Sequence, residues 1–396
     1  MVTRRRVWPR LLLSVVLVAA LAVAAVLQWD WVRARAGDAA DQVSRWSTRL
    51  RVTALTLPEA EIESRSVTGE SAAALIVIGA GEEDAAFALI AVAPTGPPSL
   101  VILPQSMLLS VPGYGEFRLI DALRFEGADL AALSVTNQFG VRIDRVVAVP
   151  AGTLATAIDQ PVEVELSAPM FAEQDGTIQR VVDAGASEVT PQILETLLIV
   201  PGEGDPFEFL QRQGAVWRAV MAAVAARPAL ADNLLGDAGG AAAADLLVTV
   251  AGDPDAVLVT VPVERAPSAW PDTVAPVRDR IDGFIAERLG HLLIRPGVRP
   301  RIEILNGNGR VGATRGVAGI LVRLGFHLIR TDNADRFDYR ETLVIGQGQH
   351  NEGPAREAAA ALGRGSLQLE VRAPSAVVDV SIIVGEDIPT EEGRGS

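Results

Sequence analysis

An uncharged apolar run near the start of the chain limits where the rest of the protein can fold. Residues 11–27 read LLLSVVLVAALAVAAVL, and Trp8, Trp29 and Trp31 stand at its two ends, as interfacial aromatic side chains do in membrane proteins. The run is long enough to span a bilayer as a helix. Because arginines and no acidic residue precede it, the positive-inside rule predicts a cytoplasmic N-terminus and an outward-facing body.

We therefore expect residues 1–31 to form a cytoplasmic tail and a single-pass transmembrane anchor, and the arginine-rich residues 32–70 to form a helical stalk. Ala-x-Ala triplets within the apolar run leave a second interpretation open, in which the run is a cleaved signal peptide. Both interpretations place the body outside the cytoplasm, where ATP and NAD are not normally supplied.

The body begins with three apolar runs of strand length, AAALIVIGAG, AAFALIAVAP and SLVILP, each ended by Gly or Pro. A helical pattern follows at residues 128–139, and then come the strand RVVAVP, the short helix GTLATAI and the strand VEVEL. The longest helical pattern is FEFLQRQGAVWRAVMAAVAARP, which stops at a proline. Because helices and strands alternate, we predict an α/β domain with an α-β-α arrangement over residues 71–292.

A second, smaller unit follows a proline-containing linker, IRPGVRP. Residues 300–387 alternate strand, helix, strand, strand, helix and strand, which predicts a small α/β domain. The Ala- and Gly-rich run that starts at Ala238 in the first domain is expected to be a loop that leads into a helix or strand. The polar residues 388–396 are expected to be disordered.

Composition excludes several kinds of site. Cysteine and lysine are absent, so all 35 basic residues are arginine and neither thiolate nor Schiff-base lysine chemistry is available. The only histidines, His291, His327 and His350, have no acidic cluster at metal-ligand spacing beside them, and we expect no metal and no cofactor. With 49 acidic residues the net charge is −14, so nucleic acid is not an expected partner.

A glycine pattern in the second unit has the spacing of a dinucleotide-binding turn. Gly307, Gly309 and Gly312 form G-x-G-x-x-G between a strand and a helix, and Asp332 follows at the expected interval. An NAD-binding module at residues 301–332 is therefore one hypothesis. The small size of the unit and its compartment disfavour it, and the alternative is that these glycines serve a tight turn and helix packing.

The same stretch, IEILNGNGRVGATRGVAGILVRLGF, resembles the C-terminal domain of LytR-type cell-wall proteins, LytR_C. The Asn306-Gly307 turn, Gly312 and the LGF of residues 324–326 stand where that domain has its strand, Asn-Gly turn, helix and Leu-x-x-x-Gly-aromatic pattern. The resemblance implies a role in binding at the cell envelope and brings no known catalytic residue.

The first domain is similar to a LytR-CpsA-Psr (LCP) domain. LVILPQSMLLSVPGYGEFRLIDAL, FGVRIDRVVAVPAGTLATAI and FLQRQGAVWRAVM follow the order of that family's motifs. The resemblance implies transfer of a glycopolymer phosphate from a polyprenyl-pyrophosphate lipid to peptidoglycan. Arginines and magnesium-binding aspartates of the family are implied to hold the pyrophosphate, because both stabilise charge on phosphate oxygens.

Several of these family positions have lost their charge. Gln105 and Ser106 stand where the family has Arg-Asp, Phe209 stands at the first arginine of its R-x-x-R-Q motif, and no arginine lies between Glu195 and Asp205. Each lost charge-assisted contact typically costs about 2–4 kcal/mol of transition-state stabilisation. We therefore expect the LCP-like domain to be catalytically inactive, with no catalytic residues.

Six charged or polar side chains remain as candidates for lining a ligand groove: Asp84, Arg118, Asp121, Arg124, Arg212 and Gln213. The alternative is that they form ordinary surface pairs. We predict a binding or scaffolding protein of cell-wall glycopolymer assembly, with the membrane, cell-wall glycan, polyprenyl lipid or other envelope proteins as partners. The alternative is an active phosphotransferase using Mg²⁺, which requires arginines such as Arg118, Arg124 and Arg142 to converge on one pocket.

Overall fold

The computed structural model describes residues 71–388 apart from residues 80, 82, 175, 240, 267–269, 271, 364–367 and 373. The predicted anchor at residues 1–31 and the predicted stalk at residues 32–70 lie outside the described residues, as does most of the C-terminal tail. Within the described part of the chain, no helix is both long enough and apolar enough to cross a membrane.

A five-stranded sheet forms the centre of the first domain, in the order β11-β3-β2-β1-β6. The antiparallel strands β1, β2 and β3 come first along the chain, and β6 and β11 add to the two sides in parallel. The three predicted apolar runs form β1, β2 and β3. The strands are β1 (Ala72–Ile78), β2 (Ala86–Val92), β3 (Ser99–Leu103), β6 (Arg145–Val149) and β11 (Val257–Thr260).

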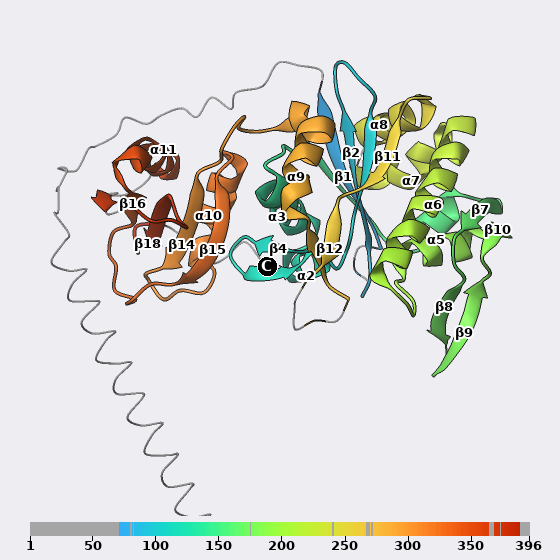
Figure 1. Cartoon of the computed structure of the whole chain (residues 1–396), viewed down its shortest axis with the longest axis horizontal. Helices are drawn as coiled ribbons and strands as arrows, with labels where there is room; N and C mark the ends of the chain where they lie inside the picture. Colours follow the sequence, from blue (N-terminus) through green and yellow to red (C-terminus); the bar gives the residue numbers. More distant parts are fainter. Residues whose placement is uncertain are drawn as a thin grey trace, which may run out of the picture.

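Helices cover both faces of this sheet, because its central strands are apolar on both sides (Figure 1). Ile76 and Ile78 of β1 pack into one core, and Leu75 and Val77 pack into the other. The first core lies under α4 (Thr153–Ala157), α5 (Pro191–Ile199), α6 (Pro206–Ala226), α7 (Ala229–Gly239) and α8 (Ala241–Gly252). The second lies under α2 (Leu119–Glu126), α3 (Ala128–Phe139) and α9 (Arg278–Phe284). The mixed α/β class of the first domain agrees with the sequence prediction.

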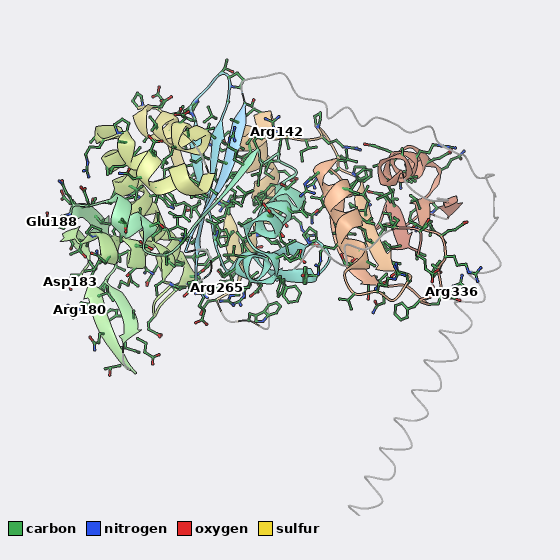
Figure 2. The ribbon with its side chains drawn as sticks, turned by 180° about the vertical axis from the view of Figure 1, so that it is seen from behind. Arg142, Arg180, Asp183, Glu188, Arg265 and Arg336 are labelled. Carbon is green, nitrogen blue, oxygen red and sulfur yellow. The ribbon has the colours of Figure 1, made fainter. Side chains whose placement is uncertain are left out.

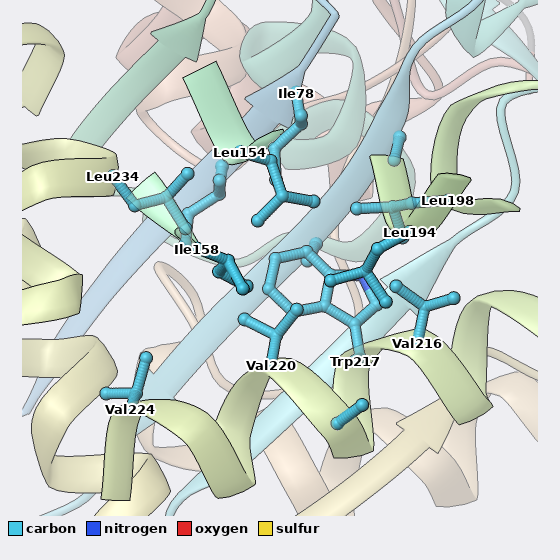
Figure 3. Packing of buried hydrophobic residues seen from close by; sticks show 14 of the residues in the cluster. Ile78, Leu154, Ile158, Leu194, Leu198, Val216, Trp217, Val220, Val224 and Leu234 are labelled. Carbon is cyan, nitrogen blue, oxygen red and sulfur yellow. The ribbon is translucent and has the colours of Figure 1, made fainter. Parts of the chain in front are cut away.

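Trp217 of α6 fills the space between the sheet and α5 (Figure 3). Its side chain has 0% exposure and packs among Leu194, Leu198 and Val220. A tryptophan at this position supplies the largest fully buried side chain of the domain. The apolar core on this face of the sheet is therefore filled by the Trp217 side chain.

Four two-stranded hairpins or ribbons surround the sheet, and sequence reasoning identified only one of their strands, β7. They are β4 (Leu108–Val111) with β5 (Gly115–Arg118), β7 (Val162–Leu166) with β10 (Gly185–Val189), β8 (Met170–Gln174) with β9 (Thr177–Val182), and β12 (Val263–Arg265) with β13 (Val274–Pro276). The charged side chains Arg180, Asp183 and Glu188 lie at the outer end of the molecule on and beside these strands (Figure 2). The Ala- and Gly-rich run leads into a helix, as expected, but its described residues are helical instead of a loop: α7 ends at Gly239 and Ala241 to Ala244 begin α8. Alanine has the highest helix propensity, which explains the difference.

The second unit has a five-stranded sheet, in the order β15-β14-β18-β16-β17, with two helices on one face. Its elements are β14 (Arg301–Asn306), α10 (Ala313–Arg323), β15 (His327–Asn333), β16 (Leu343–Gln347), α11 (Glu352–Leu362), β17 (Gln368–Arg372) and β18 (Val380–Val384). The predicted order of strands and helices is observed, with β17 as an additional strand.

A buried amide joins the two units. Asn137 of α3 is 1% exposed; its Nδ2 donates to the carbonyl oxygen of Leu328 in β15, and its Oδ1 accepts from the Leu328 N–H, both at 2.9 Å. Leu328 lies in an edge strand, whose backbone groups have no strand partner on that side. The Asn137 side chain of the first domain thus supplies hydrogen-bond partners to the backbone of the edge strand of the second domain.

Arginines complete the contact between the units. The half-buried Arg299 donates to the carbonyl oxygens of Gly325 (3.1 Å) and Phe326 (2.9 Å), and its side chain lies against Gly140 at the end of α3. Arg315 of α10 pairs with Glu126 at the end of α2 and donates to the Tyr114 hydroxyl (2.8 Å). The second unit is therefore fixed to α2, α3 and the β4–β5 hairpin.

Replacing Trp217 tests how much the closed core contributes to stability. We expect Trp217→Ala to lower the free energy of unfolding by about 3–5 kcal/mol, because the substitution leaves a cavity in a packed core. Trp217→Phe is the matched control. It keeps most of the apolar volume and removes an indole N–H that has no partner among the described residues, so its cost should be clearly smaller. Urea unfolding checks this, and equal losses for the two variants would contradict it.

The stability of the second unit should depend on pH through His327. Burial, with the nearby charges of Arg299 and Arg301, lowers the pKa of His327 from 6.5 to about 4. The unfolded chain therefore binds a proton between these values that the folded chain does not bind, so the contribution to stability is complete above pH 6.5 and falls as the pH drops toward 4. We expect His327→Gln to flatten this dependence in thermal unfolding, whereas His350→Gln, at an exposed position, should keep the wild-type slope.

Candidate functional site

A pocket of about 380 Å³ opens between the loop after β1, the start of α4 and the side of α5. It is lined by Glu83, Asp84, Ala151, Gly152, Ala155, Gln192, Glu195, Thr196, Ile199 and Val200. Three of these side chains carry a carboxylate and none carries a guanidinium. The pocket thus includes α5 and the residues after it, the segment in which the LCP resemblance leads one to expect arginines.

Glu195 forms the polar floor of this pocket. Its carboxylate is buried, and its two oxygens accept from the backbone N–H groups of Gly152 and of Ala155 (2.8 Å) at the start of α4. These N–H groups are free of intrahelical partners at a helix start and attract negative charge. An internal carboxylate therefore already occupies the anion-attracting backbone donors at the start of α4.

Asp84 is held at the edge of the same pocket by Gln105. The Gln105 Nε2 donates to Asp84 Oδ1 (3.2 Å), and its Oε1 accepts from the Ala85 N–H (2.9 Å). Burial raises the pKa of Asp84, as does the neighbouring Glu83, while the Gln105 hydrogen bond and the charges of Arg124 and Arg118 act in the opposite direction. Gln105 is buried and orders this loop without adding a positive charge.

Asp121 lies between two guanidinium groups. Both its oxygens accept from Arg118, at 2.8 Å from Nε and 2.8 Å from Nη2, and Oδ1 lies 3.5 Å from Arg124 Nη1. Burial alone would raise the pKa of Asp121, but the hydrogen bonds and charge of Arg118 more than offset burial and hold that pKa below its usual value. A second nitrogen of Arg124 donates to the backbone carbonyl of Glu83. The structure thus brings Asp84, Arg118, Asp121 and Arg124 together, with both arginines already paired.

Arg212 and Gln213 lie behind the pocket wall. Arg212 donates to the carbonyl oxygens of Leu197 (3.1 Å), Val200 (2.8 Å) and Pro201 at the end of α5, and Gln213 Nε2 donates to that of Leu198 (2.9 Å). Burial lowers the pKa of Arg212 to about 10. These side chains hold the end of α5 in place and are not among the pocket-lining residues.

The other sequence-selected positions have structural contacts. Phe209 is buried with the Arg212 guanidinium 4.9 Å from its ring centroid, and the Ser106 carbonyl accepts from the Val274 N–H (3.2 Å). Arg142 pairs with Asp144 and donates to the Ser71 carbonyl oxygen (2.8 Å), at a different place on the first domain (Figure 2). No arginine from another segment is among the residues that line this pocket.

The surroundings of Asp121 do not fit a magnesium site. Mg²⁺ prefers carboxylate oxygens together with phosphate and water, but both oxygens of Asp121 are already taken by Arg118. No group of three or more His, Asp or Glu side chains placed to hold a metal ion occurs in the part of the chain that the structure describes. Asp121 therefore serves as the internal partner of Arg118, and the positive charges of Arg118 and Arg124 beside it disfavour binding of a metal cation.

In the glycine turn of the second unit, a side chain of the turn itself binds the backbone N–H groups. Asn306 Oδ1 accepts from the N–H groups of Asn308 (3.3 Å) and Gly309 (3.0 Å), which would otherwise be free to meet a phosphate. Gly309 and Gly312 have φ values of 70° and 76°, where glycine is favoured. A Cβ on Gly307 would lie 2.7 Å from Ile383, so this glycine serves close packing.

Sequence reasoning did not select Glu83, Gln192, Glu195 or Thr196 as pocket residues. Gln192, Glu195 and Thr196 follow a helical spacing on α5, which predicts a common face but gives no indication of what that face meets. The contact between α4 and α5 is tertiary, and only this contact makes Glu195 part of a site.

The C-terminal unit matches a known protein family. Residues 299–387 match the LytR_C family, described as "LytR cell envelope-related transcriptional attenuator". No curated protein matches the sequence.

Solved structures similar to this chain include a LytR-Csp2A-Psr enzyme from Actinomyces oris, at 18% identity and a TM-score of 0.45, covering 56% of this chain and 92% of that one. TagT from Bacillus subtilis has 14% identity and a TM-score of 0.44, covering 60% and 96%, and TagT is also known bound to LI-WTA. The transcriptional regulator ywtF from Bacillus subtilis has 15% identity and a TM-score of 0.46, covering 61% and 98%. The chain therefore carries a LytR_C domain at residues 299–387, as its sequence motifs indicated.

Proposed function

We propose that this chain is a membrane-anchored, outward-facing cell-envelope protein that binds or scaffolds components of cell-wall glycopolymer assembly without catalysing phosphate transfer. The LytR_C domain and the LCP-like motifs support the envelope role. The chemistry of the pocket carries the proposed lack of catalysis, because Glu83, Asp84 and Glu195 line it and no arginine does.

Electrostatics make this pocket unfavourable for a diphosphate. A diphosphate placed here would face three carboxylates in a partly buried setting, where like charges repel more strongly than in water. Bidentate guanidinium contacts are the usual means of stabilising phosphate oxygens. The arginines near this pocket, Arg118, Arg124 and Arg212, are already bound to Asp121 or to backbone carbonyl oxygens.

Rearranging these arginines would be costly. Turning Arg118 toward a ligand breaks two hydrogen bonds to Asp121 and leaves that buried carboxylate without its main partner. Turning Arg212 frees three carbonyl oxygens at the end of α5. Conversion of this site into a diphosphate clamp would therefore weaken the elements that form the pocket.

A transfer assay tests the proposal. The full chain in detergent, given polyprenyl-pyrophosphate-linked glycopolymer, Mg²⁺ and peptidoglycan, should transfer no phosphate-linked polymer above the rate without protein. Release of the lipid product and attachment of the polymer to peptidoglycan are both measured. Transfer above the background rate would establish the active phosphotransferase instead.

A variant with added arginines tests whether the lack of guanidinium groups in the pocket prevents pyrophosphate binding. We expect the wild type to show no heat of binding with inorganic pyrophosphate in calorimetry. Gln192→Arg together with Thr196→Arg adds two guanidinium groups to the α5 wall and should bind pyrophosphate at least about tenfold more tightly. Val298→Arg, at a position 94% exposed in the linker, is the matched control and should bind as weakly as the wild type. Equal gains for both variants would show that net charge alone is responsible.

A further inference from the structure

Four aromatic rings form a continuous row on the first domain, close to the second. Tyr114 and Phe125 are stacked with centroids 4.5 Å apart, Phe117 meets Phe125 edge-on at 5.0 Å, and Trp270 lies 5.9 Å from Phe117. The rings come from the β4–β5 hairpin, from α2 and from the loop between β12 and β13. Figure 1 shows β4, α2 and β12 close together on the side of the domain that faces β15.

Two of these rings face solvent and two support them. Phe125 and Trp270 are 38% and 37% exposed, whereas Tyr114 and Phe117 are half-buried. Each of the two exposed rings contacts Phe117, which links them. A ligand with two or more rings can therefore contact both.

One end of the row, at Tyr114, is held from the second domain. Arg315 of α10 lies with its guanidinium 5.0 Å from the Tyr114 ring centroid and donates to the Tyr114 hydroxyl (2.8 Å), which itself donates to Glu126 (2.9 Å). Arg315 also pairs with Glu126. At the other end, Thr273 donates to the Trp270 carbonyl oxygen (2.8 Å). The Tyr114 ring fixed in this way supports the stacked Phe125 ring, which reduces the conformational entropy that Phe125 loses when a ligand binds.

The size of the exposed patch argues against a folded protein partner. An aromatic side chain buries about 150–250 Å² when fully covered, so two rings exposed to this degree offer far less than the roughly 800 Å² per partner of a stable protein interface. Charged groups, Arg124, Glu126 and Arg315, border the rings instead of further apolar side chains. A net charge of −14 disfavours a nucleic acid that would stack its bases there.

A chain of sugar rings fits these features. A pyranose presents a flat face of C–H groups to an aromatic ring and hydroxyl groups around its edge, where charged side chains can bond them. The row also leads to the pocket: Arg124, next to Phe125, donates to the carbonyl oxygen of Glu83, a pocket-lining residue. A glycan on the row would thus lie beside the loop that carries Glu83.

We propose that Phe125 and Trp270, supported by Phe117 and Tyr114 and fixed by Arg315, form a stacking surface for an uncharged glycan chain of at least two sugar units. This inference rests on the proposed function and names its ligand class. The LytR_C domain contributes to the surface through Arg315, which holds Tyr114.

Calorimetry of the full chain with chitohexaose, a soluble chain of N-acetylglucosamine units, tests the proposal. We expect the hexamer to bind and free N-acetylglucosamine to bind clearly more weakly, because one ring covers only one of the two exposed aromatic side chains. Phe125→Ala and Trp270→Ala should each weaken hexamer binding about fivefold to tenfold. Phe337→Ala is the control: Phe337 is 52% exposed in the second domain, outside the row, and its loss should leave binding unchanged.

Two results would overturn the glycan surface: no binding of the hexamer by the wild type, or wild-type binding by both row variants. If the row variants no longer bound an envelope protein but bound the sugar as the wild type does, the row would be a protein contact. That result would also contradict the proposal. Circular dichroism and thermal unfolding confirm that each variant is folded. Phosphate transfer by the wild type would overturn the lack of catalysis and leave the stacking surface standing, so the two proposals fail separately.

Discussion

The carboxylate of Glu195 is the contact on which the candidate site depends. By accepting from the N–H groups of Gly152 and Ala155 it ties α5 to the start of α4, and these two elements form most of the pocket. The same contact uses the backbone donors that would attract an anion and adds a negative charge to the floor. Shape and charge are therefore determined together, because the interaction that joins α4 and α5 also places a carboxylate in the pocket lining.

The arginines near the pocket, like the carboxylate of Glu195, are bound to partners within the fold. Asp121 takes both hydrogen-bonding edges of Arg118 and shares the charge of Arg124, and the carbonyl oxygens at the end of α5 take Arg212. A guanidinium group satisfied within the fold contributes to structure and loses its availability for a ligand. The charged residues that remain in the LCP-like domain thus have a structural explanation that does not require a substrate.

The two domains are joined by contacts that also order the proposed glycan surface. Asn137 pairs with the edge of β15, and Arg315 reaches from α10 to Tyr114 and Glu126. These contacts hold the LytR_C domain against α2 and the β4–β5 hairpin, which carry Arg118, Asp121 and Phe125. Long-range contacts of this kind leave no local pattern, because Asn137 and Leu328 lie far apart in the sequence and neither is unusual for its own element.

The sequence alone determined the α/β class, the strands β1, β2 and β3, the helices α3 and α6, and the LytR_C domain, because apolar periodicity and glycine or proline punctuation are local properties. The resemblance to LCP motifs also led to the prediction that Gln105, Ser106 and Phe209 stand at positions that carry charge in that family. The partners of Glu195, Asp121 and Arg212, and the contacts among the four aromatic rings, become visible once the chain is packed. The reason is physical: a side chain's charge and shape are local, but its partner depends on which distant segments the packed sheet brings beside it.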